Sequence, residues 1–213
     1  MTPGSHRPVA VPSQPGHHLG VDARRWLRVR LKRLSYGSVG RGRDGERVVA
    51  WLQVRPGMRV ADIGSGFGDF AIRFGAAVGR DGTVYAVDTD EDLRAEVGRL
   101  AAQQGLSQVQ STAATPDDPG IPEAVDLVFL SSSFHHLPDR DGYFEHVRDL
   151  LQPGGRVAIL EPRRTLLTGW FGHATAPEDV CATMEAAGFR RLDGSDLVRW
   201  ASLQTFVPAD GPR

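Results

Sequence analysis

The sequence predicts an α/β fold in which helices cover both faces of a largely parallel sheet. Two observations support this prediction. From residue 45 onward, short runs of apolar residues alternate with segments of helical period. The apolar runs are too uniformly hydrophobic for strands that keep one face in water, which is typical of parallel strands buried on both faces.

The helices of this pattern are recognised by apolar spacing and by the residues that bound them. The helix 91–105 ends at Gly105, a residue type common just past a helix end. The helix 176–188 has Pro177 near its start, where proline is favoured. The other predicted helices are 46–53, 69–78 and 140–151.

The strands are short apolar runs bounded by turn residues. The run 124–132 is the most strongly apolar, and the segment 190–208 predicts a pair of terminal strands joined through Asp193 and Gly194. The other predicted strands are 59–64, 83–88, 156–162 and a weak one at 108–112.

Composition limits the class of protein. The chain has 213 residues, 40% hydrophobic and 24% charged, which suits a globular domain with a sizeable core. The net charge of −1 gives no general attraction to nucleic acid. The single cysteine, Cys181, excludes an internal disulfide framework and suits a cytoplasmic protein. We expect neither a membrane span nor a signal peptide, and no metal site.

The chain divides into three predicted parts. Residues 1–20 are rich in Pro, Gly, Ser and His and predict a disordered leader. Residues 21–44 predict a helix, strongly basic over 24–33, and a glycine-rich connector. The basic helix has two open interpretations: a surface for an anionic partner, or a solvated face packed over the main domain. Residues 45–213 form that domain.

A dense cluster of glycines follows the first predicted strand of the main domain. Gly64, Gly66 and Gly68 stand within five residues. Glycine costs conformational entropy and contributes no side-chain packing, so the backbone must approach something closely. Ligands of parallel sheets bind at the carboxyl ends of the strands, where N–H groups at a helix start can donate to them. The cluster therefore predicts a ligand-binding turn.

Two acids beside this turn indicate the kind of ligand. Asp62 precedes the first glycine by two residues, and Asp88 ends the next strand. The spacing G-x-G-x-G differs from the G-x-G-x-x-G of dinucleotide sites. A carboxylate at Asp62 disfavours a pyrophosphate and favours a sulfonium with an amino-acid tail, while Asp88 can accept both hydroxyls of a ribose. The alternative is a glycine turn without a ligand.

Four segments resemble the motifs of a known family, in order and spacing. "VADIGSGFG", "VYAVDTD", "AVDLVFLSSSFHHL" and "LLQPGGRVAILEP" resemble motifs I, post-I, II and III of the class I S-adenosylmethionine-dependent methyltransferases. The resemblance covers residues 46–190 and is closest to small bacterial enzymes of the ubiquinone, menaquinone and arsenite type. Arsenite enzymes use several cysteines, so that substrate does not fit Cys181 alone.

The resemblance implies a Rossmann-like sheet of seven strands, mostly parallel, with the last strand antiparallel. It implies S-adenosylmethionine as the cofactor, bound by residues 45–213. Asp62 would lie near the methionyl amino group, and Asp88 would hold the ribose hydroxyls. The glycine turn would line the methionine and ribose portions through Gly64, Ser65, Gly66 and Gly68.

The remaining cofactor contacts implied by the resemblance concern the adenine and the methyl group. Thr89 would lie beside the adenine, and Ser131 near the transferring methyl. The family often places an acid after the third strand, against the adenine amino group. Residues 114–115 are Ala and Thr here, and the candidates just beyond them are Asp117 and Asp118.

Three histidines are candidates for chemistry. Methyl transfer requires mainly alignment and exclusion of water, and a base is needed only when the nucleophile carries a proton. His135 and His136 follow the strand 124–132, where they could act as a base or pack and cap. His173 precedes a helix and could close over the acceptor. Glu161, at the end of strand 156–162, could face the substrate or cap the strand.

The leading hypothesis is a methyltransferase that acts on a small organic acceptor, with no nucleic-acid partner; a homodimer is left open. An RNA or protein methyltransferase that uses the basic helix is a second hypothesis, because such a helix could hold a polymer. A non-catalytic scaffold is a third, although the intact acids argue against it. A nicotinamide reductase is disfavoured, because the third glycine is out of register.

Overall fold

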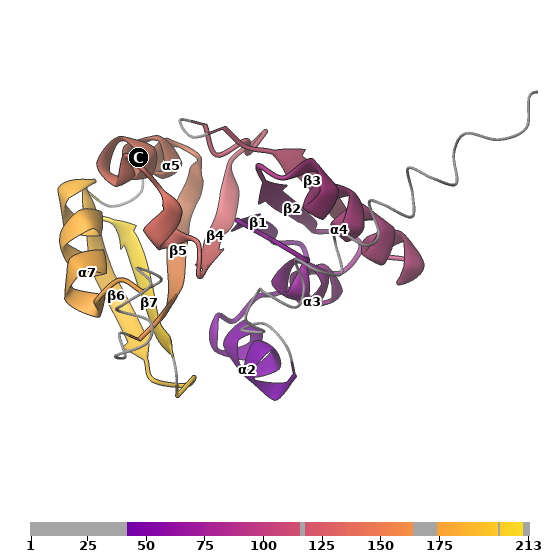
Figure 1. Cartoon of the computed structure of the whole chain (residues 1–213), viewed down its shortest axis with the longest axis horizontal. Coiled ribbons are helices and arrows are strands. Elements are labelled where there is room, and N and C mark those ends of the chain that lie inside the picture. Colours follow the sequence, from indigo (N-terminus) through magenta and orange to yellow (C-terminus); the bar gives the residue numbers. More distant parts are fainter. Residues whose placement is uncertain (1–41, 116–117, 164–173, 200, 211–213) are drawn as a thin grey trace, which may run out of the picture.

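The computed structural model describes residues 42–115, 118–163, 174–199 and 201–210. Within them, seven strands form one sheet in the order β3-β2-β1-β4-β5-β7-β6 (Figure 1). The strands are β1 (Arg59–Ile63), β2 (Thr83–Asp88), β3 (Val109–Ala113), β4 (Val125–Ser131), β5 (Leu151–Pro162), β6 (Phe189–Ser195) and β7 (Ala201–Pro208).

The pairing within this sheet confirms the predicted topology. Strands β1 to β5 pair in parallel, and β7 pairs antiparallel with both β5 and β6. The order along the sheet reverses between β1 and β4, so the chain crosses from one half of the sheet to the other at that point. Ligands of open α/β sheets bind outside such a reversal.

Helices cover both faces of the sheet, as predicted (Figure 1). Side chains alternate along the strands: Leu127 and Phe129 of β4 pack on one face, and Val128 and Leu130 on the other. Three helices cover the first face: α2 (Arg43–Trp51), α3 (Asp69–Val78) and α4 (Glu91–Gln103). Two helices cover the second face: α5 (Arg140–Asp149) and α7 (Pro177–Ala186). A short 3₁₀ turn, η1 (Phe134–His136), follows β4.

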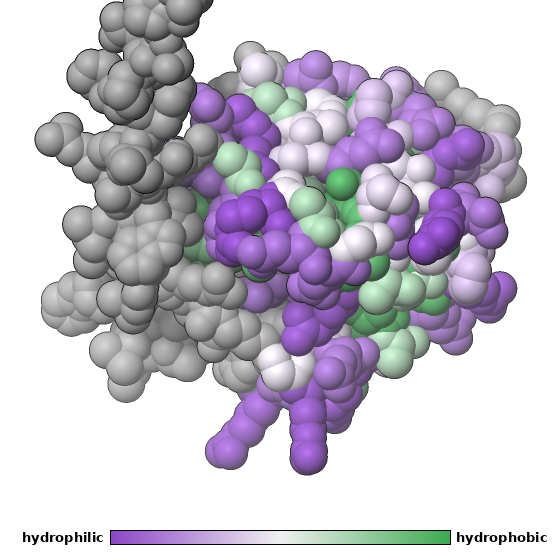
Figure 2. Space-filling model, turned by 90° about the vertical axis from the view of Figure 1, so that its right-hand side faces the viewer, coloured by the Kyte–Doolittle hydropathy of each residue, from purple (hydrophilic) through white to green (hydrophobic). Residues whose placement is uncertain are grey.

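The outer surface is polar where Figure 2 shows it. Hydrophilic side chains predominate on that face, and hydrophobic atoms form small separate patches between them. No helix within the described residues is long and apolar enough to cross a membrane.

The predicted turn through Asp193 and Gly194 is wrong. Both residues lie within β6, opposite Thr205 and Gln204 of β7, beside an irregularity of register that follows Arg191. The chain reverses further on, where Val198 is 1% exposed and packs into the core. Burial of this apolar residue favours the longer connection over the tight turn that the sequence suggested.

Several predicted features lie outside the described residues. They are the leader 1–20, the basic helix 24–33, Asp117 and His173.

Candidate active site

A cavity of about 600 Å³ lies at the carboxyl edge of the sheet, where β1, β2 and β4 end. It meets the position at which the strand order reverses. Eight of the residues expected from the sequence line it: Asp62, Gly64, Ser65, Gly66, Asp88, Thr89, Ser131 and His136. Gly68 and His135 do not line the cavity, although each has a neighbour in the chain that does.

The glycine turn between β1 and α3 adopts backbone angles that favour glycine. Gly64, Gly66 and Gly68 have φ values of +70°, +54° and +77°. A Cβ on Gly64 would lie 2.6 Å from the Cβ of Ser133, whereas a Cβ on Gly66 would meet nothing closer than a backbone oxygen at 4.0 Å. Part of the demand for glycine therefore comes from the protein itself, and Gly66 is the position whose open side is left for a ligand.

Hydrogen bonds from β2 fix the glycine turn in place. The backbone N–H groups of Gly64 and Ser65 both donate to the carbonyl oxygen of Val87 at 2.9 Å. The N–H of Gly66 donates to Oδ2 of Asp88 at 2.9 Å, and Oδ1 of the same carboxylate accepts from Asp90 N–H at 2.9 Å. The ends of β1 and β2 thus form one preorganised edge of the cavity.

Asp62 is the buried acid of the site. Its residue is 2% exposed, and Oδ2 has no hydrogen-bond partner among the described residues. Burial, reinforced by the nearby charges of Asp88 and Asp69 and opposed by the backbone N–H of Ala71, raises the pKa of Asp62 to about 8. A cation bound beside Asp62 would reverse this shift, because an opposite charge favours the ionised carboxylate.

Two hydroxyls share this unsatisfied state. Oγ of Ser65 and Oγ of Ser132 are buried without a partner among the described residues, and both residues line the cavity. Buried polar atoms are nearly always paired in folded proteins. Three such atoms around one cavity, with Asp62 Oδ2 as the third, indicate a polar ligand that pairs with them. This donor and acceptor set fits the amino-acid and ribose portions of S-adenosylmethionine.

The sequence did not predict the apolar walls of the cavity. These walls come from loop and helix residues whose spacing in the sequence is that of ordinary core residues. The sequence also did not predict the left-handed backbone conformation of Ser132, whose φ is +53°. Burial, with the charge of Asp118 nearby, raises the pKa of Tyr143, so its hydroxyl stays protonated. The walls include Phe67, Phe70, Leu137, Pro138 and Tyr143.

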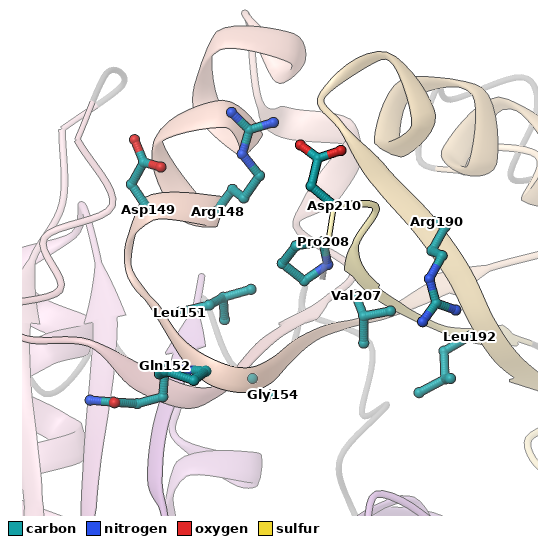
Figure 3. Close-up of a pocket in the computed structure, with 12 residues that line it drawn as sticks. Arg148, Asp149, Leu151, Gln152, Gly154, Arg190, Leu192, Val207, Pro208 and Asp210 are labelled. Atoms are coloured by element: carbon teal, nitrogen blue, oxygen red, sulfur yellow. The ribbon is translucent and has the colours of Figure 1, made fainter. Parts of the chain in front are cut away.

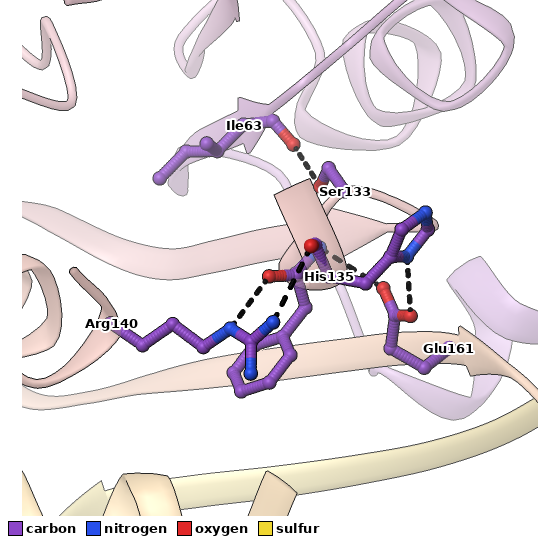
Figure 4. Close-up of polar contacts among 6 residues, drawn as sticks. Ile63, Ser133, His135, Arg140 and Glu161 are labelled. Atoms are coloured by element: carbon purple, nitrogen blue, oxygen red, sulfur yellow. Dashed lines mark hydrogen bonds and ion pairs between the residues drawn. The ribbon is translucent and has the colours of Figure 1, made fainter. Parts of the chain in front are cut away.

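The two histidines expected from the sequence lie together on η1. Their ring centroids are 4.1 Å apart, and His136 lines the cavity. Nδ1 of His135 lies 2.9 Å from Oε2 of Glu161, and Oε1 of Glu161 accepts from the N–H of Phe134 at 3.0 Å (Figure 4). Glu161, at the end of β5, therefore faces the histidine turn.

A second hollow, of about 280 Å³, lies at the opposite edge of the sheet, where β5 begins and β7 ends (Figure 3). Arg148, Arg190, Asp149 and Asp210 surround it, so charges of both signs alternate there. It shares no residue with the cavity at the carboxyl edge.

Among the described residues, no group of three or more His, Cys, Asp or Glu could hold a metal ion.

Comparisons with known proteins agree with this geometry. Residues 61–157 match the family model described as a methyltransferase domain. Aklanonic acid methyltransferase of a Streptomyces species is 33% identical over 119 residues, 55% of this chain and 54% of the relative. A ubiquinone/menaquinone biosynthesis C-methyltransferase of Teredinibacter turnerae is 32% identical over 120 residues, 54% of this chain and 48% of the relative. The chain spans about half the length of these curated relatives.

The solved structures show the same fold. A methyltransferase from Aquifex aeolicus, described as SAM-dependent, superposes with a TM-score of 0.73 at 22% identity, covering 83% of this chain and 96% of that one. The matched family segment runs from β1 into β5 and holds Asp62, Asp88 and the glycine turn. The chain is thus similar to methyltransferases in sequence over residues 61–157, and its fold is that of a SAM-dependent methyltransferase structure.

Proposed function

We propose that the chain binds S-adenosylmethionine in the cavity at the carboxyl edge and transfers its methyl group to a small organic acceptor. The observation that carries this proposal is the pair of carboxylates on either side of the glycine turn. Asp62 is buried with an unpartnered oxygen, and Asp88 is already anchored to Gly66. This arrangement suits a cationic nucleoside and disfavours a phosphate-bearing one.

Each part of the cofactor has residues of suitable chemistry. Asp62 would pair with the ammonium group of the cofactor, which gives the buried carboxylate a positively charged partner. Each carboxylate oxygen of Asp88 accepts one hydrogen bond from a backbone N–H and keeps a lone pair available for a ribose hydroxyl. Thr89 and Asp117 are proposed beside the adenine, and Ser131 beside the methyl group. When bound, the cofactor supplies a carbon that carries a good leaving group.

The protein's own contribution to the reaction is to align the acceptor with the methyl group and to enclose both away from water. Apolar side chains around the cavity exclude water from the reacting atoms. His135, His136 and His173 are the candidates for taking up a proton from the acceptor. The names of the relatives concern aklanonic acid and ubiquinone or menaquinone biosynthesis, which support a small organic acceptor. The bacterial relatives and the single cysteine support a cytoplasmic bacterial enzyme.

Calorimetric titration with S-adenosylhomocysteine tests the proposal. The wild-type protein should bind it, and Asp62→Asn should weaken binding of S-adenosylmethionine by tenfold or more, because the ammonium loses its charged partner. Asp81→Asn, in an exposed turn, is the matched control and should bind like the wild type. Absence of binding by the wild-type protein would overturn the proposed function.

A further inference from the structure

Tyr143, on α5, is a buried tyrosine that lines the cavity at the carboxyl edge. It is 5% exposed, and its ring packs against that of Phe144 with the two centroids 5.7 Å apart. Within the described ranges, no residue forms a hydrogen bond with its hydroxyl. A hydroxyl taken out of water costs free energy unless a new hydrogen bond replaces the lost one. A ligand in the cavity can supply that bond.

Tyr85, on β2, has a comparable hydroxyl that the protein itself satisfies. It is 4% exposed and belongs to the same apolar cluster as Tyr143. Its hydroxyl donates to a carboxylate oxygen of Glu123, and the residue does not line the cavity. The two tyrosines therefore differ in one respect that matters for binding: Tyr85 has a protein partner, whereas Tyr143 lies against the cavity.

The hydroxyl of Tyr143 lies toward the segment that follows β3. The charge of Asp118 acts on this hydroxyl. Asp118 is joined to Thr115 by two hydrogen bonds: the N–H of Thr115 donates to the carbonyl oxygen of Asp118 at 3.0 Å, and the N–H of Asp118 donates to Oγ1 of Thr115 at 3.1 Å. Thr115 and Ala114 directly follow β3 and line the cavity. Tyr143 and these two residues thus border the same end of the cavity.

The strand order determines which part of the proposed cofactor meets this end. The adjacent strands β1, β2 and β3 lead in turn to Asp62, Asp88 and Ala114. Asp88 is in register with Ala113, and the N–H of Ala114 donates to the carbonyl oxygen of Asp88 at 3.3 Å. In S-adenosylmethionine the ribose carries the sulfonium with its amino-acid tail on one side and the base on the other. With the ammonium at Asp62 and the ribose at Asp88, the base extends toward the end of β3.

We propose that the hydroxyl of Tyr143 donates a hydrogen bond to a ring nitrogen of the cofactor's base and is a specificity-determining residue for that base. This inference rests on the proposed function. The ring nitrogens of adenine that do not carry the sugar only accept hydrogen bonds. Burial keeps the hydroxyl protonated by raising the pKa of Tyr143, so it remains a donor. Leu137 and Pro138 line the same cavity and limit competition from water.

Removal of the hydroxyl alone gives the first test. In calorimetric titration, Tyr143→Phe should bind S-adenosylhomocysteine about tenfold more weakly than the wild type, because a ring nitrogen loses its donor. The melting temperature of the unliganded variant should not fall, because the hydroxyl bonds no described residue. The matched control Tyr85→Phe should bind like the wild type. Unchanged affinity or a lower melting temperature in Tyr143→Phe, or an equal loss of affinity in Tyr85→Phe, would overturn the inference.

Analogues of the base give the second test. In each analogue of S-adenosylhomocysteine, one accepting ring nitrogen is replaced by C–H, and each is titrated into the wild type and Tyr143→Phe. The analogue that lacks the contacted nitrogen should bind both proteins equally, whereas the others should keep the difference of about tenfold between them. The same difference for every analogue would overturn the inference. A wild-type protein that still binds S-adenosylhomocysteine in that case leaves the proposed function standing, and one that does not bind it overturns both.

Discussion

The carboxylate of Asp88 is hydrogen-bonded to the backbone N–H of Gly66 at 2.9 Å, so the end of β2 and the glycine turn after β1 are fixed to each other. This contact spans 22 positions of the chain and gives Asp88 two duties, one toward the turn and one toward the proposed ribose. The same acid therefore shapes the glycine turn and, in the proposed function, recognises the ligand.

Replacement of Asp88 should reveal both duties. Asp88→Ala should weaken binding of S-adenosylhomocysteine by about 1.5–3 kcal/mol, because charge-assisted hydrogen bonds to the ribose and to Gly66 are lost together. Asp88→Asn keeps one acceptor oxygen and should cost less. Calorimetric titration measures both, and an affinity equal to that of the wild type in Asp88→Ala would contradict the ribose assignment.

Binding of S-adenosylmethionine should depend on pH through Asp62. The pKa of this carboxyl is about 8 in the free protein, because it is buried and faces Asp88 and Asp69, against one lowering contact from the N–H of Ala71. An ammonium partner requires the ionised form, so binding releases a proton below about pH 8, and affinity should rise up to tenfold per pH unit as pH approaches that value. Titrations in buffers of different ionisation enthalpy should detect the released proton; its absence at about pH 7 would contradict this account.

The same carboxyl should lower the stability of the unliganded protein as pH rises. Its folded pKa of about 8 lies above the ordinary value of 3.8, so the folded state binds more protons between these values. Stability therefore falls as pH rises through that window, since the unfolded state ionises first. Asp62→Asn lacks this effect, and its melting temperature should exceed that of the wild type by more at about pH 8 than at about pH 5. A difference that stays constant with pH, in thermal unfolding followed by circular dichroism, would speak against a buried protonated Asp62.

The glycines of the turn should separate folding from binding. Gly64→Ala should lower the melting temperature, because its Cβ meets Ser133 at 2.6 Å in addition to the left-handed strain of about 1–2 kcal/mol. Gly66→Ala carries the strain alone, and its Cβ has open space, so it should melt higher than Gly64→Ala yet bind S-adenosylhomocysteine more weakly than the wild type. Thermal unfolding and calorimetry on the two variants check this contrast. If Gly66→Ala kept full affinity, the open side of the turn would not be the ligand's.

The positions of the two acids at the strand ends, Asp62 and Asp88, were predictable from the order of strands and helices along the sequence. Parallel strands end at one edge, so Asp62 and Asp88 had to lie near each other once β1 and β2 were recognised. The partner of Gly64 was not predictable, because Ser133 approaches it from a turn far along the sequence. The roles of Phe70 and Tyr143 were hidden for a related reason: helical spacing shows that such a residue is buried, but not whether it faces core or cavity.

The hydroxyl of Ser133 donates to the carbonyl oxygen of Ile63 at 3.0 Å, and a Cβ on the next residue, Gly64, would meet the same serine. Two residues further along the chain lies the imidazole that Glu161 holds. Ser133 thus connects the glycine turn after β1 with the turn that carries the two histidines. A substitution at Ser133 should therefore disturb both turns at once.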